Sequence, residues 1–443
     1  MAEKFDAVVI GGGPGGYVCA IRLAQLGKKT ACIESRGSLG GTCLNVGCIP
    51  SKSLLNLSEN FHKAKNFDKI GIELGSLKLN LPKMMKNKEK AVTVLTKGIE
   101  FLFKKNKVSY FKGTGSIIGN NQVSVKSDDN KEEKIETKNI IIATGSDPVS
   151  LPGIKFDEEK IVSSTGALSL KEVPKKLVVV GGGYIGLEIA ATFRQIGLEV
   201  SVVEVADRLL ARVASPPVAE LLAGLHQERG VVLYTGTGVE EVFQNNGLFS
   251  GVKLTDGTNL VGDILVVGIG VTPDSDLALQ AGIETETTAG GAVLVDEYQL
   301  TSDLDVFAIG DVAFQRGSPL RLESIHNAQE SGARAAAAIM GKPLPAVQAP
   351  WFWSDQYDAN LQSVGIVPMG DRNVYQVIRG EFPEKRASFW SYRDKKLLAV
   401  EAVRDGASFM LGKKCLEENI SPNPSLISDL EFDPMAWILK NSA

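Results

Sequence analysis

The sequence is poor in histidine and cysteine, has little excess charge of either sign, and contains no long hydrophobic run. A net charge of −4 over 443 residues argues against general nucleic-acid binding, which usually needs a basic excess. No uninterrupted apolar run approaches the ~20 residues that a membrane helix requires. Residues 5–10 already form a predicted strand, which leaves no room for a signal peptide. We therefore expect a cytoplasmic protein that binds neither nucleic acid nor membrane.

Five cysteines are present, an odd number that does not resemble the disulfide framework of a secreted protein. Cys19 and Cys32 are flanked by apolar residues, so we expect them to be buried in a helix and a strand. Cys415 fits either a buried or a surface position. Cys43 and Cys48 form a close pair, which in a cytosolic enzyme favours redox or metal chemistry.

Length and internal repetition indicate several domains. A chain of 443 residues, 44% of them apolar and 23% charged, suits about three globular domains. The same unit occurs at residues 5–35 and 176–205, as an apolar strand, a glycine turn, an amphipathic helix and a second strand. From the first glycine to the closing glutamate the spacing is equal, 34 − 11 = 23 and 204 − 181 = 23. Two βαβ units in equal register predict two dinucleotide sites on doubly wound sheets.

The first glycine turn has the pattern G-x-G-x-x-G at Gly11, Gly13 and Gly16. Glycine is needed there because the backbone turns tightly and approaches a pyrophosphate with no Cβ in the way. The helix N-terminus then offers N–H groups to the phosphate charge. Glu34 ends the next strand, where a carboxylate accepts hydrogen bonds from a ribose diol.

The second glycine turn has the same pattern at Gly181, Gly183 and Gly186. Glu204 follows it, and a carboxylate at that place binds the 2′-hydroxyl of NADH and repels the 2′-phosphate of NADPH. Arg208 would weaken this preference, whereas the neighbouring Asp207 would restore it. The sequence therefore predicts NADH as the second nucleotide.

Three further loops follow predicted strands. Residues 139–148 and 263–274 each run from a strand into a Gly/Pro turn, and residues 301–312 end a strand on Asp311. Ligands bind at the carboxyl ends of strands in such sheets, so Asp311 is a candidate to hold a ribityl hydroxyl. The other nucleotide-binding candidates in these loops are Thr144, Gly145 and Gly270.

The segment GGTCLNVGCIPSK, residues 40–52, is the most specific motif. In a straight helix, residues five apart are separated by ~7.5 Å of rise, whereas a disulfide needs Cα atoms within ~4.4–6.8 Å. Cys43 and Cys48 can therefore bond only if the turn is distorted, and Gly47 supplies that freedom. Such a disulfide is easily reduced, and the helix dipole stabilises the resulting thiolate. A zinc site would need a second Cys/His pair, which the sequence lacks.

Residues 1 to about 180 closely resemble dihydrolipoamide dehydrogenase, in the pyridine nucleotide-disulfide oxidoreductase superfamily. The resemblance is carried by GGGPGGYVCAIRLAQLG and by GGTCLNVGCIPSK. It implies that FAD binds at the first glycine turn and Glu34. It also implies that Cys48 faces the flavin and that Cys43 meets the external thiol.

The same resemblance implies that Lys52 lies near the flavin N5 and pairs with Glu188, and that Tyr184 gates the nicotinamide pocket. Dihydrolipoamide dehydrogenases also use a C-terminal His, paired with an acid, as the base for the thiol. The histidines of this chain are His62, His226 and His326, and none follows residue 326. Without that base, proton transfer loses a factor of roughly 10²–10⁴, so we expect slow lipoamide turnover unless His326 substitutes for it.

From about residue 190 onward the chain is similar to the flavoprotein ferredoxin reductases that serve cytochrome P450 and dioxygenase systems. The similar segments are EVADRLLARVASPPVAELL, RLESIHNAQESGARAAAAIMG and APWFWSDQYDANLQSVG. The similarity implies that Trp353 lies against the flavin. Trp351 in its place, or a Trp-rich core segment, are the alternatives.

The basic residues change type along the chain. Residues 1–180 hold 26 Lys and two Arg, whereas residues 181–341 hold one Lys and seven Arg, which favours a recombined chain, natural or engineered. Residues 61–112 hold 13 Lys and four acidic residues, and the apolar spacing Met84, Val92, Leu95, Ile99, Phe103 predicts a long amphipathic helix. Its lysine face is either a solvated face or a docking surface for a small acidic electron-transfer protein.

These features together predict an α/β, glutathione-reductase-like fold with two doubly wound dinucleotide-binding domains and a C-terminal αβ interface domain. The expected segments are 1–150 and 285–345 for FAD, 151–284 for NAD and 346–443 for the interface domain. The favoured function is hydride transfer from NADH to FAD and on to an electron acceptor, a protein or a quinone-like molecule. The alternatives are a disulfide reductase acting on a dithiol substrate through Cys43–Cys48, and a chimeric nucleotide-binding scaffold with poor turnover. Both a monomer and a homodimer are compatible with the sequence.

Overall fold

The computed structural model describes residues 3–119, 121–381 and 386–440, which form two compact units. The first unit comprises Met1–Pro50, Lys86–Pro148 and Val271–Ala346, and the second comprises Ser51–Met85, Val149–Gly270 and Val347–Ala443. Each unit is therefore assembled from segments that are distant in the sequence.

A seven-stranded sheet forms the centre of the first unit, in the order β3-β2-β1-β6-β5-β4, with β19 also paired to β6. Strands β3, β2, β1, β6 and β19 are parallel, whereas β4 and β5 continue from β6 as antiparallel strands. The bounds are β1 Glu3–Ile10, β2 Thr30–Glu34, β3 Ser109–Lys112, β4 Thr114–Gly119, β5 Gln122–Lys126, β6 Glu132–Ile142 and β19 Val306–Ala308. Strands β2 and β19 and the final residues of β1 and β6, 7–10 and 140–142, are buried and mostly apolar, as expected for a sheet covered on both faces.

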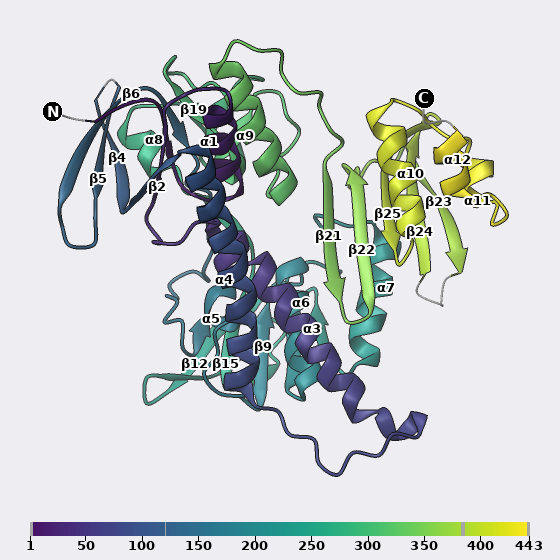
Figure 1. Ribbon diagram of the computed structural model, residues 1–443. Helices are drawn as coiled ribbons and strands as arrows, with labels where there is room; N and C mark the ends of the chain where they lie inside the picture. The colour runs from purple at the N-terminus through teal and green to yellow at the C-terminus, as the bar shows by residue number, and fades with distance from the viewer. Residues whose placement is uncertain (1–2, 120, 382–385, 441–443) are drawn as a thin grey trace. The chain divides into compact units, whose positions relative to one another are not determined.

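Two helices of the first unit, α1 (Pro14–Gln25) and α9 (Ile325–Ile339), pack against each other beside this sheet (Figure 1). The backbones of the two helices approach each other closely at Gly332 and Gly15. A Cβ added to Gly332 would lie only 2.5 Å from the carbonyl oxygen of Gly15. Further helices and strands of this unit are α2 Gly41–Val46, β7 Ser146–Pro148, β16 Val271–Pro273, α8 Asp276–Gln280, β17 Thr285–Glu286, β18 Ala292–Val295 and β20 Ala313–Gln315, and two 3-10 helices lie at Thr287–Ala289 and Gly310–Val312.

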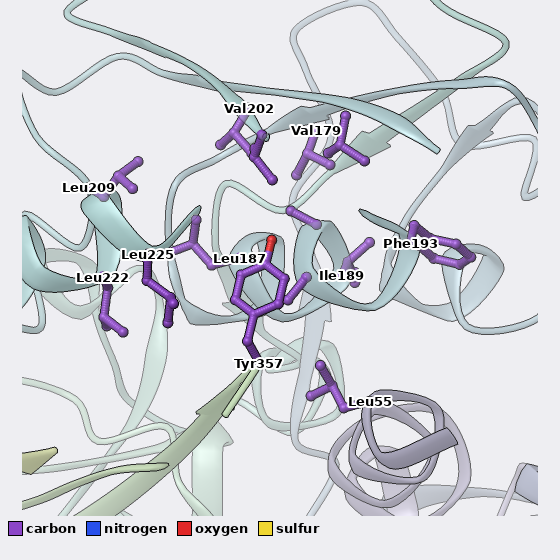
Figure 2. Packing of buried hydrophobic residues seen from close by; sticks show 14 of the residues in the cluster. Leu55, Val179, Leu187, Ile189, Phe193, Val202, Leu209, Leu222, Leu225 and Tyr357 are labelled. Carbon is purple, nitrogen blue, oxygen red and sulfur yellow. The ribbon is translucent and has the colours of Figure 1, made fainter. Parts of the chain in front are cut away.

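A five-stranded parallel sheet, β11-β10-β9-β15-β8, forms the core of the second unit. Its bounds are β8 Ile161–Val162, β9 Lys176–Val180, β10 Glu199–Glu204, β11 Val232–Thr235 and β15 Ile264–Val267. The helices of this part are α5 Ser164–Ala167, α6 Tyr184–Ile196 and α7 Pro216–Glu228. Figure 2 shows Leu187, Ile189 and Phe193 of α6 packed in a cluster that also contains Leu222 and Leu225 of α7.

The second unit also contains two antiparallel sheets. The smaller has the order β12-β13-β14, and the larger, near the C-terminus, has the order β21-β22-β25-β24-β23. Helix α10 packs on the larger sheet, and the side chain of Asp405 caps its first turn by accepting the N–H of Ser408. The bounds are β12 Val239–Asn245, β13 Leu248–Leu254, β14 Asn259–Val261, β21 Trp351–Gln356, β22 Ala359–Gly365, β23 Val374–Glu381, β24 Arg386–Arg393, β25 Lys396–Val403, α10 Gly406–Glu417, α11 Pro424–Ser428 and α12 Pro434–Lys440.

Two long helices include residues of both units, α3 (Cys48–Lys65) and α4 (Leu81–Asn106). The predicted amphipathic helix is confirmed as α4, and Met84, Val92 and Phe103 are buried, but Leu95 is 41% exposed and does not belong to its buried face. Cys19 and Cys32 are buried as expected, and Cys415 is buried too. Among the described helices, none is both long and apolar enough to cross a membrane.

Candidate active site

The first glycine turn lies between β1 and α1. Gly11 has a φ of +112°, and a Cβ there would lie 2.1 Å from the carbonyl oxygen of Ala143. A Cβ on Gly16 would lie 1.9 Å from the carbonyl oxygen of Gly11. These glycines are required by the packing of the protein itself. A Cβ on Gly13, by contrast, would meet only the Cα of Gly41, at 3.7 Å.

Glu34 closes this turn from the end of β2. Its buried carboxylate accepts the N–H of Gly12 at 2.9 Å on one oxygen and the N–H of Arg36 at 2.7 Å on the other. Each carboxylate oxygen has two lone pairs, so one on each oxygen is left for the hydroxyls of a ribose. The acid is thus held at the strand end where the sequence predicted a ribose contact.

The second glycine turn, between β9 and α6, repeats this arrangement. Gly181 has a φ of +109°, and a Cβ there would lie 2.3 Å from the carbonyl oxygen of Gly268. A Cβ on Gly186 would lie 2.1 Å from the carbonyl oxygen of Gly181, whereas a Cβ on Gly183 would meet no atom within 4 Å. The first and third glycines are again required by packing, and the second is not.

Glu204 occupies the place of Glu34 in the second copy. Its carboxylate accepts the N–H of Gly182 at 2.6 Å and the N–H of Ala206 at 2.8 Å. The guanidinium of Arg208 donates to main-chain carbonyls of residues 209, 211 and 214, at 3.3, 3.1 and 3.0 Å. Most of its donors are therefore used inside its own loop.

The N-termini of α1 and α6, next to Gly13 and Gly183, could each bind a diphosphate. Gly13 and Gly183 are the N-cap residues of α1 and α6, and neither helix has a side chain that caps its first turn. The first N–H groups of each helix are consequently open to an external acceptor, and the helix dipole favours an anion there. Since no Cβ occupies this space, the backbone can approach a pyrophosphate at both places.

The loops of the first unit place three more predicted residues. The carboxylate of Asp311 accepts the hydroxyl of Ser146 at 2.9 Å, and burial raises the pKa of Asp311. The Thr144 hydroxyl donates to the carbonyl of Asp274 at 2.6 Å, and the Asp274 N–H donates to the carbonyl of Gly145 at 3.0 Å. These contacts hold together the loops that follow β6 and β16.

Gly270 belongs to the second unit, after β15. Its φ of +135° lies in the region that only glycine readily adopts, and its carbonyl accepts the N–H of Val149 at 3.0 Å. This glycine therefore shapes the turn that follows the sheet, and its structural role needs no ligand.

The dithiol motif forms two helices separated at Gly47. Cys43 lies within α2, and Cys48 is the first residue of α3. Gly47 has φ −134° and ψ −114°, and a Cβ there would lie 2.9 Å from the carbonyl oxygen of Thr42. Both cysteines are half-buried. The helix is thus interrupted at the residue where the sequence predicts a distorted turn.

Lys52 and Glu188 form a half-buried ion pair in the second unit, with Nζ and Oε1 2.6 Å apart. The same carboxylate accepts two hydroxyls, Ser51 Oγ on Oε2 at 2.7 Å and Ser354 Oγ on Oε1 at 2.8 Å. The ammonium also lies 5.4 Å from the centroid of the Trp353 ring, within cation–π range. Three side chains from two elements, α3 and β21, thus donate to one buried carboxylate on α6.

Aromatic rings surround this pair. Tyr184, one turn before Glu188 on α6, stacks on Phe352 of β21 with centroids 4.5 Å apart. Trp351 packs instead against Trp353 at 5.6 Å and against Phe409 at 6.4 Å. Of the two tryptophans that the sequence left as alternatives, Trp353 lies over the Lys52 ammonium.

The three histidines have different environments. His62 on α3 lies 2.9 Å from a guanidinium nitrogen of Arg229, and burial lowers its pKa. His226 on α7 is fully buried beside Gln356. His326 on α9 has its Nε2 4.0 Å from a carboxylate oxygen of Glu330.

Sequence reasoning missed Ser51 and Ser354. Ser51 precedes Lys52 within the dithiol motif, so its proximity to the ion pair was open to prediction. Ser354 is separated from Glu188 by 166 residues, and a lone serine in a strand carries no pattern that points to a distant acid. Among the described residues, no group of three or more His, Cys, Asp or Glu side chains is arranged to hold a metal ion.

Comparison with known proteins identifies relatives of both parts of the chain. Residues 5–332 match the family described as pyridine nucleotide-disulphide oxidoreductase, and residues 351–436 match the reductase C-terminal family. Dihydrolipoyl dehydrogenase 1 of Arabidopsis thaliana, a mitochondrial protein, is 45% identical over 346 residues, which cover 77% of this chain and 67% of that protein. Leghemoglobin reductase of Vigna unguiculata is 47% identical over 351 residues, which cover 77% of this chain and 65% of that protein. The chain thus spans about two thirds of the length of these relatives.

Two solved structures are similar over nearly the whole chain. A ferredoxin reductase of Rhodopseudomonas palustris has a TM-score of 0.78 and 29% identity, with 98% of this chain and 99% of that chain covered. Putidaredoxin reductase, in a covalent complex with putidaredoxin, has a TM-score of 0.77 and 26% identity, with both chains covered completely.

The comparisons bear on the two resemblances. An alignment covering 77% of the chain extends well beyond residue 180, so the predicted limit of the dihydrolipoamide dehydrogenase resemblance is not confirmed, nor is a recombined origin. The predicted glutathione-reductase-like α/β fold is confirmed. With the motifs and geometry above, these matches show that the chain belongs to the pyridine nucleotide-disulphide oxidoreductase family, whose members are oxidoreductases that use FAD and NAD(P)H.

Proposed function

We propose that this protein takes hydride from NADH onto FAD and passes electrons to an external acceptor, as a ferredoxin reductase does. The observation that carries the proposal is the extent of the similarity. The ferredoxin reductase structures are similar over 98–100% of the chain, including residues 351–436, which match the reductase C-terminal family.

The two glycine turns support the assignment of the nucleotides. We propose that the first turn, with Gly11, Gly13, Gly16 and Glu34, holds FAD, and that Thr144, Gly145 and Asp311 contribute to the same site. The second turn, with Gly181, Gly183, Gly186, Glu204 and Gly270, would hold NADH. When bound, FAD supplies a two-electron acceptor for hydride, and the protein supplies the position and charge of the groups around it.

The environment of Glu204 supports NADH over NADPH. Its carboxylate keeps acceptor capacity for a 2′-hydroxyl and would repel a 2′-phosphate. The donors of Arg208 are bound to three loop carbonyls, so this arginine is poorly placed to attract a phosphate. Specificity for NADH is part of the proposal.

Lys52, Glu188, Tyr184 and Trp353 are proposed to act beside the flavin. A half-buried Lys–Glu pair keeps a positive charge at a fixed place, where it favours negative charge that develops nearby. Tyr184, the first residue of α6, stacks on Phe352 of β21 and would control access of the nicotinamide to the flavin. The segments 1–150, 151–284, 285–345 and 346–443 remain our proposal for the domain boundaries.

The acceptor in this proposal is a small acidic electron-transfer protein or a quinone-like molecule. The solved complex of putidaredoxin reductase with putidaredoxin is a precedent for a protein partner. Helix α4 offers a lysine-rich surface that would suit an acidic protein, for example at Lys90 and Lys97. Charge complementarity of this kind mainly raises the rate of encounter.

A second function is favoured by the dithiol motif and by the 45% identity to dihydrolipoyl dehydrogenase. In that case electrons pass through Cys43 and Cys48 to an external disulfide. Relatives of similar identity carry the names dihydrolipoyl dehydrogenase and leghemoglobin reductase, so this shared part does not decide the acceptor. The absence of histidine after residue 326 in the sequence weighs against efficient lipoamide turnover.

Acceptor assays on the purified protein test these functions. We expect about one FAD per chain, rapid reduction by NADH, and rapid onward reduction of ferricyanide but slow reduction of lipoamide. Fast lipoamide turnover would establish the disulfide reductase instead. Bound nucleotides with no turnover of any acceptor would identify a binding scaffold and refute both enzymatic functions.

A further inference from the structure

A continuous series of buried side-chain hydrogen bonds leads away from Glu188 into β21 and α7. Ser354 Oγ lies 2.8 Å from Glu188 Oε1, and Gln356 Nε2 lies 3.3 Å from Ser354 Oγ. Gln356 Oε1 lies 3.0 Å from His226 Nε2, and Tyr357 Oη lies 3.4 Å from His226 Nδ1. All these residues belong to the second unit. They link an ion pair in the proposed site to a histidine that has no place in the reaction described so far.

The carboxylate determines the direction of every bond in this series. A carboxylate only accepts hydrogen bonds, so the Ser354 hydroxyl must donate to Glu188. Ser354 therefore accepts from the amide NH₂ of Gln356, which places the amide oxygen toward His226. That oxygen requires a donor, so the His226 proton is on Nε2. Nδ1 is then an acceptor for the Tyr357 hydroxyl.

Burial makes this order costly to change. Ser354, Gln356 and His226 are each at most 1% exposed, and burial lowers the pKa of His226 to about 4. The ring is consequently neutral at neutral pH and has a single N–H to place. Moving the His226 proton to Nδ1 would leave two buried acceptors, Nε2 and the Gln356 amide oxygen, facing each other, which costs about 1–3 kcal/mol.

Strand β21 matches helix α6 in spacing. Phe352 contacts Tyr184, and two residues later Ser354 contacts Glu188. Two strand residues advance ~6.8 Å, and the four helix residues from 184 to 188 advance ~6 Å, so successive inward positions of the strand meet successive turns of the helix. The next inward position, Gln356, reaches His226 on α7.

Apolar packing fixes the far end of the series. Figure 2 shows the ring of Tyr357 among Leu187 and Ile189 of α6 and Leu225 of α7. The guanidinium of Arg229 lies 5.2 Å from the centroid of the same ring. The tyrosine is thus held in place by contacts that do not depend on its hydroxyl.

We propose that Ser354, Gln356 and His226 are positioning residues that orient the Glu188 carboxylate and, through it, the Lys52 ammonium. Lys52 and Ser354 share Oε1 while Ser51 occupies Oε2, so the carboxylate cannot rotate without breaking a bond to a charged acceptor. Without Ser354 the carboxylate keeps its bonds to Lys52 and Ser51 but loses the third bond that fixes its orientation. This inference rests on the proposed function, because it assigns Lys52 to the flavin site.

The tautomer of His226 tests the series independently of turnover. The chain has three histidines, so holoenzyme labelled with ¹⁵N-histidine gives three rings to assign. We expect His226 to be protonated at Nε2 only at neutral pH. Ser354→Ala and Glu188→Gln should each shift both His226 nitrogen signals and leave those of His326, in the first unit, unchanged. A proton on Nδ1 of His226, or His226 signals that neither variant moves, would overturn the proposal.

Flavin reduction by NADH tests the consequence for Lys52. Ser354→Ala should slow the reduction about tenfold, the lower end of the effect of a hydrogen bond to a charged group. Ser354→Thr, which keeps the hydroxyl, should restore the rate to within about twofold. Ser391 is a matched control, since it is also buried in a strand and accepts a glutamine amide, that of Gln376, at 3.1 Å. Ser391→Ala should leave both the rate and the His226 signals unchanged.

Failure of this inference can be told from failure of the proposed function. If the unmodified protein binds FAD and is reduced by NADH, but Ser354→Ala behaves like Ser391→Ala, only the positioning role is refuted. If NADH does not reduce the unmodified protein, the proposed function is refuted, and the tautomer measurement alone decides whether the hydrogen-bond series exists.

Discussion

The two copies of the βαβ unit have almost the same turn but different helix environments. The first glycine has a φ of +112° in one copy and +109° in the other. In both copies the next N–H donates to the glutamate 22 residues later, at 2.9 Å for Glu34 and 2.6 Å for Glu204. Even the leucine side chain that faces the middle of the turn recurs, as Leu39 and Leu209.

The helices that follow bury different kinds of residue. Helix α1 buries apolar and small residues and packs on α9 through Gly15 and Gly332. Helix α6 buries polar side chains as well, at Glu188, Thr192 and Gln195. The buried Glu188 and Gln195 have side-chain partners on α3, and Glu188 has a further partner on β21.

This difference shows that the sequence of the turn and the sequence of the helix are constrained by different contacts. The turn is dictated by backbone packing and by the closing glutamate, so it is the same wherever the unit occurs. The helix is dictated by its neighbours. The first copy has the features of a nucleotide cradle alone, and the second adds the ionisable side chain of the proposed site.

The largest expected effect is loss of bound nucleotide, with a different nucleotide lost when each glycine turn is altered. Gly13→Val should fold, because its Cβ meets only Gly41 at 3.7 Å, but it should lose nearly all bound FAD since the side chain blocks the pyrophosphate. Gly183→Val should keep FAD and weaken NADH binding by about 10–100-fold. FAD content is measured by absorbance after denaturation, and NADH binding by rapid-mixing reduction.

Gly16→Val provides the control for that pair. Its Cβ would lie 1.9 Å from a carbonyl oxygen, so the variant should lose folded protein as well as FAD. Full FAD retention by Gly13→Val, or loss of FAD from Gly183→Val with NADH binding preserved, would break the comparison between the two turns.

The second prediction concerns the dithiol, which follows the first turn only. Reduction of lipoamide should be roughly 10²–10⁴-fold slower than in an enzyme with a thiol base. Cys43→Ser should leave ferricyanide reduction within about twofold, because the proposed acceptor reaction needs no thiol. Adding NADH without an acceptor should give a long-wavelength absorbance band that Cys48→Ser abolishes. Rapid lipoamide turnover would contradict this prediction and make His326 the first candidate for the base.

The third prediction compares the two closing glutamates. Glu204→Gln should narrow the preference for NADH over NADPH by about 1–3 kcal/mol, because a charged hydrogen bond and a repulsion are both removed. Glu34→Gln should weaken FAD binding and leave the choice of nicotinamide unchanged. Steady-state kcat/KM for both nucleotides measures the effect. Equal use of NADH and NADPH by the unmodified protein would show that Arg208 dominates the site.

Much of the fold and of the candidate site could be predicted because the residues that define it lie within short segments of the sequence. The glycine turns, their glutamates and the dithiol each occupy a short segment whose residue types have one plain physical use. Ser354, Gln356 and His226 had no such signal, since the contacts that join them to Glu188 and to one another include pairs 166 and 130 residues apart. Leu95 also shows the limit of pattern reading, because apolar spacing placed it on a buried face and the fold leaves it exposed.

The smallest expected effect concerns pH and again distinguishes the surroundings of α6. Burial lowers the pKa of His226 from 6.5 to about 4 and raises the pKa of Glu401 from 4.5 to about 7. For His226 the unfolded chain binds the extra proton, so its contribution to stability is complete above pH 6.5 and is lost as the pH falls toward 4. For Glu401 it is the folded chain that binds the extra proton. The contribution of Glu401 to stability is therefore complete below pH 4.5 and is lost as the pH rises through 7.

Between pH 4.5 and 6.5 these two contributions have opposite slopes of about 1.4 kcal/mol per pH unit and should nearly cancel. The unmodified protein should therefore show little change in melting temperature from this pair across that range. In His226→Gln only Glu401 titrates, so the stability of this variant should fall as the pH rises. In Glu401→Gln only His226 titrates, so the stability of this variant should rise with pH. Calorimetric melting of the holoenzyme at several pH values measures both slopes, and parallel profiles for the three proteins would show that these buried groups do not titrate as their environments dictate.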